Sequence, residues 1–118
     1  MAAAQHNITI LQGATFDMSA TWADDVGNPE DLTGVLARMQ VRQSHKSEEV
    51  LLDLDSDALG GITLDVPTGK IDVSIAAGLT AALPGRLRGV YDLELEFPGG
   101  RVVRLLQGRV RVDPEVTR

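Results

Sequence analysis

The 118-residue sequence contains no cysteine, and only 3% of its residues are aromatic. Disulfide bonds and thiolate metal sites are therefore excluded, so aliphatic packing or neighbouring subunits must stabilise the fold. No apolar run approaches the ~20 residues that cross a bilayer, and residues 1–6 have neither the basic region nor the apolar stretch of a secretory signal. We expect a protein that has no membrane partner and does not use the Sec export route.

Basic residues are also scarce, because 11 lysines and arginines stand against 17 acids and give a net charge of −6. Binding to phosphate backbones requires clustered lysine and arginine, so nucleic acid is not an expected partner. The net charge is −8 over residues 1–65 and +2 over residues 66–118. Two interpretations fit this asymmetry: solvated strand faces, or complementary surfaces that meet between copies of the chain.

The sequence is rich in short segments that alternate between apolar and polar residues. Phe16, Met18 and Trp22 share one parity of such a segment, which is typical of a strand with one buried face. The alternation predicts strands over residues 7–11, 14–22, 35–42, 50–54, 61–64, 70–75, 91–97 and 101–112. A helix of about two turns is predicted over residues 76–83, where Pro84 ends it.

Together these elements predict an all-β fold: an immunoglobulin-like antiparallel β-sandwich of about seven to eight strands with one short crossover helix. A jelly roll gives similar alternation at this length, so the strand pairing stays open. We expect a flexible N-terminal arm at residues 1–6, one sandwich domain at 7–113 and a C-terminal tail at 114–118.

Turn residues mark the connections, including an expected turn over residues 24–29. The last predicted strand changes phase, because Val103 and Leu105 lie on odd positions whereas Leu106, Val110 and Val112 lie on even positions. We expect a bulge near Gly108, or a strand that switches sheets, to reconcile the two phases.

Asp53, Asp55 and Asp57 have the spacing of the first three ligands in an EF-hand calcium loop. The pattern then fails, because Ala58 stands where the loop needs glycine and Leu64 where it needs a bidentate glutamate. A solvated acidic face is the simpler interpretation, and we predict no metal site.

Catalytic chemistry is not indicated either. His6 and His45 lie in polar segments without an evident carboxylate or serine partner for general-base work. The acids of residues 92–96 are about 7 Å apart on one wet strand face, as on any such strand. We therefore predict no enzyme activity and no cofactor.

Trp22 and Tyr91 offer a different kind of site, because aromatic rings can form the floor of a carbohydrate site. That role requires one of them to be exposed beside polar groups. Trp22 instead shares its parity with Phe16 and Met18, which favours a position in the core.

Turn and strand patterns recur in a characteristic order along nearly the whole chain, at residues 8–10, 12–16, 20–22, 27–29, 31–34, 37–42, 61–64, 80–84, 91–95 and 108–118. In this order they resemble small structural proteins of tailed bacteriophages and prophages. The chain is similar to the N-terminal domain of phage upper baseplate proteins, an immunoglobulin-like sandwich that joins receptor-binding proteins to the tail. Because the sequence stops after one domain, it is more similar to a free-standing adaptor or decoration protein.

The resemblance implies a non-enzymatic virion component, assembled in the bacterial host cytoplasm, that docks in multiple copies onto other phage structural proteins. A tail or baseplate adaptor is the first expectation, head decoration or neck is the second, and a homo-oligomer or symmetric assembly is expected. The alternative is a carbohydrate-binding module that recognises the host surface. Candidate partner-interface residues are Arg38, Arg42, Arg104, Arg109, Arg111, Asp53, Asp55 and Asp57.

Overall fold

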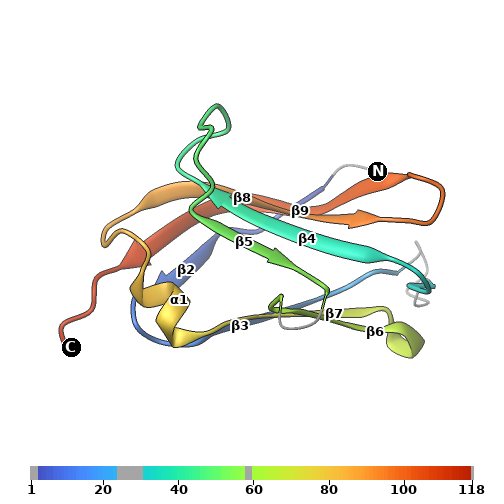
Figure 1. Cartoon of the computed structure of the whole chain (residues 1–118), viewed down its shortest axis with the longest axis horizontal. Helices are drawn as coiled ribbons and strands as arrows, with labels where there is room; N and C mark the ends of the chain where they lie inside the picture. Colours follow the sequence, from blue (N-terminus) through green and yellow to red (C-terminus); the bar gives the residue numbers. More distant parts are fainter. Residues whose placement is uncertain (1–2, 24–30, 58–59, 118) are drawn as a thin grey trace.

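The computed structural model describes residues 3–23, 31–57 and 60–117. Two β-sheets lie one over the other, and a short helix sits at one end of them (Figure 1). The prediction of an all-β sandwich with one short helix is confirmed.

The large sheet has the strand order β1-β9-β8-β4-β5, with β2 also paired to β9, and the small sheet has the order β3-β7-β6. The strands are β1 (Ala4–Gln5), β2 (Ile8–Leu11), β3 (Phe16–Thr21), β4 (Leu36–Arg42), β5 (Leu52–Asp55), β6 (Ile62–Asp65), β7 (Lys70–Ile75), β8 (Arg88–Glu96) and β9 (Val102–Asp113). A 3-10 turn, η1 (Val66–Thr68), precedes β7, and the helix α1 (Ala77–Ala81) follows it.

The core lies between the sheets because each strand turns its apolar parity inward. In β8, for example, Leu93 and Leu95 are fully buried, whereas Asp92 and Glu94 between them face outward. Removing aliphatic side chains from water stabilises the fold by about 25 cal/mol per Å² of apolar surface. The aromatic residue Trp22 joins this core, where its ring centroid lies 6.1 Å from that of Phe97.

The N-terminal edge of the large sheet differs from the expected antiparallel arrangement. Both β1 and β2 run parallel to β9, whereas the other strand pairs are antiparallel. The chain leaves β2 through Gly13, at φ 84°, and enters β3 in the other sheet, so β2 forms no hairpin with β3 and pairs with the distant β9. Backbone pairing also begins at Ala4, before the expected start of the domain at residue 7.

The phase change in β9 lies at Leu105, not near Gly108 as predicted. Leu106 pairs with Leu93 and Arg104 pairs with Glu94, so Leu105 is the extra residue of a bulge. Glycine is needed at position 108 for another reason, because a Cβ atom there would collide with the backbone carbonyl of His6.

The predicted helical connection is present in the structure. The predicted helix over residues 76–83 is observed as α1, and the fully buried Thr80 fixes it to the β2–β3 connection. The Thr80 hydroxyl accepts a hydrogen bond from Gly13 N (3.0 Å) and lies 2.8 Å from the carbonyl oxygen of Ala14. The turn expected over residues 24–29 lies outside the described residues.

Candidate functional site

The outer face of the large sheet collects most of the nominated interface residues. Strand alternation sends them away from the core, and the register aligns them in rows across β5, β4, β8 and β9. One such row places Arg38 between Asp55 and Glu94. Seven of the eight candidates occupy this face: Arg38, Arg42, Arg104, Arg109, Arg111, Asp53 and Asp55. The eighth, Asp57, follows the end of β5.

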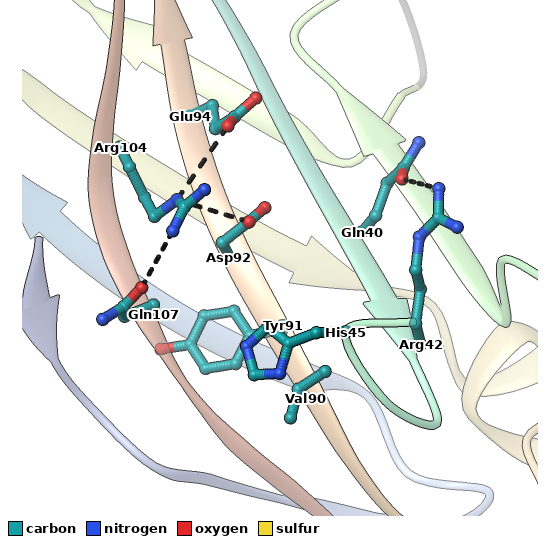
Figure 2. Close-up of a pocket in the computed structure, with 9 residues that line it drawn as sticks. All are labelled: Gln40, Arg42, His45, Val90, Tyr91, Asp92, Glu94, Arg104 and Gln107. Atoms are coloured by element: carbon teal, nitrogen blue, oxygen red, sulfur yellow. Dashed lines mark hydrogen bonds and ion pairs between the residues drawn. The ribbon is translucent and has the colours of Figure 1, made fainter. Parts of the chain in front are cut away.

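Arg104 is engaged with neighbours on this face. Its Nε lies 3.5 Å from a carboxylate oxygen of Asp92 and 4.0 Å from one of Glu94, and its Nη1 donates to Gln107 Oε1 at 3.2 Å (Figure 2). These groups are all at least one-third exposed, so each ion pair contributes at most about 1 kcal/mol to stability.

Arg42 anchors the loop that follows β4. Its Nη1 donates to the carbonyl oxygens of Ser47 (2.7 Å) and Glu48 (3.2 Å), and its Nη2 donates to Gln40 Oε1 at 2.9 Å. All these acceptors are neutral, so these hydrogen bonds do not offset the positive charge of the guanidinium. We interpret Arg42 as a support of the loop that also adds charge to the face.

The loop and the strands enclose a shallow hollow of about 310 Å³, with His45 beside Val90 (Figure 2). A neighbouring hollow of about 370 Å³ continues past His45 to Arg88, Arg109 and Arg111. Both hollows lie on the outer face, which is therefore grooved between the loop and β9.

Arginines gather at the end of this face next to α1. The register places Arg88 directly opposite Arg111, and Arg109 follows on the same face of β9. Like charges directly opposite each other destabilise a sheet. Arg111 is paired with Asp113 at 2.8 Å, whereas neither Arg88 nor Arg109 forms an ion pair with any residue that the structure describes.

Arg88 is the member of this cluster that sequence reasoning missed. The prediction began the strand at Tyr91, but β8 begins at Arg88, and the polar parity of Asp92 and Glu94 continues back to it. Gly89 interrupts the series of apolar residues, and this concealed the start of the alternating pattern at Arg88. Extending the parity across that glycine would have found the residue.

The acidic segment after residue 52 has its carboxylates turned to separate partners. Asp53 accepts from Gln40 Nε2 at 3.4 Å, and Asp55 accepts from the backbone N–H of Asp57 at 3.0 Å. Among the described residues, no group of three or more carboxylate or histidine side chains is placed to hold a metal ion.

Both candidate carbohydrate-binding rings are in the core, because Trp22 is 3% and Tyr91 4% exposed. Neither can stack against a sugar in this fold. The Tyr91 hydroxyl donates to the carbonyl oxygen of His6 at 2.6 Å, and burial raises the pKa of Tyr91 to about 12.

At Asp31, hydrogen bonds from the side chain and then the backbone of Thr33 lower the pKa of the carboxyl group.

No protein-family model matches this chain, and no curated protein matches it either. Within the described part of the chain, no helix has the length and apolar character needed to cross a membrane.

Proposed function

We propose that this protein is a non-enzymatic structural component of a tailed bacteriophage virion that docks onto other phage proteins in multiple copies. A tail or baseplate adaptor is the first placement, and head decoration or neck is the second. The phage assignment is supported by the ordered turn and strand patterns of the sequence.

One observation carries the docking role. Charged residues nominated from the sequence converge on one continuous outer face, and two of its arginines, Arg88 and Arg109, have no acidic partner among the described residues. Complementary charge of this kind steers and registers protein–protein contacts. The carbohydrate-binding alternative lacks its required feature, since Trp22 and Tyr91 are buried.

The test is to purify particles of the phage, or of the induced prophage, whose genome encodes this chain. Cryo-electron microscopy and quantitative mass spectrometry would then report whether ordered copies are present. We expect symmetric copies of the sandwich in the tail or baseplate, or at the head or neck. Mature particles that lack the chain would contradict the proposal.

The role of the charged face is tested by Arg109→Glu. We expect at least a tenfold loss of incorporation, because the reversal opposes an acidic partner surface. The matched control is Arg101→Glu, which makes the same charge change at the β8–β9 turn, where Arg101 lies 5.1 Å from the Phe97 ring centroid. Equal incorporation of both variants would exclude this face as the docking surface.

A further inference from the structure

The outer face of the large sheet carries opposite charge at its two ends. We call one part the acidic half; it contains five acids and two arginines, namely Asp53, Asp55, Asp92, Glu94, Glu96, Arg38 and Arg104. We call the other the basic half; it contains the four arginines Arg42, Arg88, Arg109 and Arg111. At its end Asp113 neutralises Arg111, so this half remains positive.

The boundary between the halves crosses the strands at Tyr91. On β8, Asp92 and Glu94 lie on one side of it, whereas Val90 and Arg88 lie on the other. Their side chains share the outer face because they have one parity, opposite to that of the buried Tyr91. A half-turn about an axis over Tyr91 that runs across the strands therefore exchanges the two halves.

We propose that a second copy of this chain docks on this face, with a two-fold axis that lies in the interface, crosses the strands and passes over Tyr91. The acidic half of each copy then meets the basic half of the other. This is a self-complementary contact, the commonest kind in homo-oligomers. The inference rests on the proposed function in that the role requires several copies.

The axis makes a specific pairing on the central strand. Arg88 and Glu94 lie three residues on either side of Tyr91, so each faces the other residue of the second copy. Within one chain they are six residues apart, which is about 20 Å along a strand. A favourable interaction between them can therefore form only between copies.

A second copy fits this face better than a polyanion does. A nucleic acid that followed the strands away from Arg88 and Arg109 would meet Asp92 and Glu94, which repel phosphate. The second copy satisfies both halves at once. It also supplies the Glu94 carboxylate to Arg88, which has no acidic partner among the described residues. On β9 the same half-turn places Arg109 over Gln107, and Arg111, which Asp113 neutralises, over Arg104.

Sedimentation velocity of the full chain tests the dimer, at 20 mM and 300 mM NaCl. We expect a monomer–dimer equilibrium whose dissociation constant rises at least tenfold at the higher salt, because screening weakens exposed charge pairs. Arg88→Glu and Glu94→Arg should each weaken the dimer at least tenfold. The double variant should recover most of the loss, and Arg101→Glu should resemble the original chain.

A cross-linking experiment keeps the test decisive if Glu94→Arg disturbs the Arg104 ion pair and fails to fold. Because the chain has no cysteine, Arg88→Cys and Glu94→Cys each introduce a single thiol. A bismaleimide that spans about 10 Å, the spacing of packed sheets, should link the two variants when mixed and neither alone. Intact folding is checked by the fluorescence of the buried Trp22.

Three results would overturn the dimer: a monomer at every concentration and salt, association unaffected by Arg88→Glu, or equal cross-linking of each cysteine variant alone. These results leave the virion role intact if particles contain the chain. In that case the face is occupied by another phage protein, which the particle map would identify. Conversely, a dimer in solution combined with particles that lack the chain would reject the virion role and retain the dimer.

Discussion

Tyr91 shows how one residue joins the core to the N-terminal edge. It is the only tyrosine in the sequence, its ring is buried, and its hydroxyl donates to the carbonyl oxygen of His6. Ionisation of a buried phenol is unfavourable, which is why its pKa is raised to about 12.

The raised pKa of Tyr91 makes stability fall at high pH. The unfolded chain loses the phenol proton near pH 10, whereas the folded chain loses it near pH 12. The contribution of Tyr91 to the free energy of unfolding is therefore complete below pH 10 and disappears as the pH rises toward 12. We expect about 2 to 3 kcal/mol of loss, by linkage at ~1.4 kcal/mol per unit. Urea denaturation at pH 9 to 12 measures it, and absorbance at 295 nm follows Tyr91 alone.

Tyr91→Phe is the control for this titration. It should lose about 1 kcal/mol at neutral pH, the value of one hydrogen bond, and the part of the pH dependence that belongs to the phenol. An unchanged alkaline slope in Tyr91→Phe would show that another group causes the loss.

Gly108 is required by the close approach of another backbone. A Cβ atom at this position would collide with the carbonyl of His6, which cannot move without breaking the edge pairing. We expect Gly108→Ala to cost about 1 to 3 kcal/mol, as overpacking does. Gly78→Ala is the control, because an added Cβ in α1 has no neighbour within 4 Å and alanine favours the helix. Equal melting temperatures for the two variants would contradict this account.

At the scale of elements, α1 depends on the rest of the fold for its position. It has five residues, which are too few to be stable alone, and no side chain caps its N-terminus. The buried Thr80 hydroxyl fixes it by hydrogen bonding to Gly13 and Ala14 in the β2–β3 connection. The crossover helix and the switch between sheets are thus one structural unit.

Two substitutions separate the hydroxyl of Thr80 from its methyl group. Thr80→Val keeps the shape but leaves Gly13 N and Ala14 O without their partner, so we expect a loss of about 2 kcal/mol. Thr80→Ser keeps the hydrogen bonds and should lose about 1 kcal/mol for one buried methyl group. Thermal denaturation followed by circular dichroism gives the order, and a serine variant less stable than the valine variant would refute it.

At the scale of the whole molecule, the first strands pair with the last strand at one edge of the large sheet. In β2, Ile8 and Ile10 are buried and pair with Val110 and Val112 of β9. By contrast, both residues of β1 are exposed. The edge is therefore held mainly by β2, and β1 adds a short extension.

Truncation measures the two contributions. A chain that starts with Met followed by His6 removes β1 and should lose about 1 kcal/mol or less. A chain that starts after Ile10 also loses two buried isoleucines and the β2–β9 pairing. That loss, above about 4 kcal/mol, is comparable to the stability of many domains, so we expect it to be unfolded. Urea denaturation followed by Trp22 fluorescence tests both, and severe loss in the shorter truncation would assign the edge to β1.

The alternation of side chains was sufficient to predict the sandwich, because strand parity is a local property that burial converts directly into an inside and an outside. It placed Trp22 in the core, predicted a short helix where α1 is observed and nominated most charges of the outer face. The parallel pairing of β1 and β2 with β9 was not predictable, since strands that pair across 100 residues leave no local signal in either segment. The bulge at Leu105 and the requirement for glycine at position 108 likewise depend on register and on the His6 backbone.

The division of the outer face into an acidic and a basic half was decided by tertiary structure alone, because only the pairing of four strands places those charges in common rows.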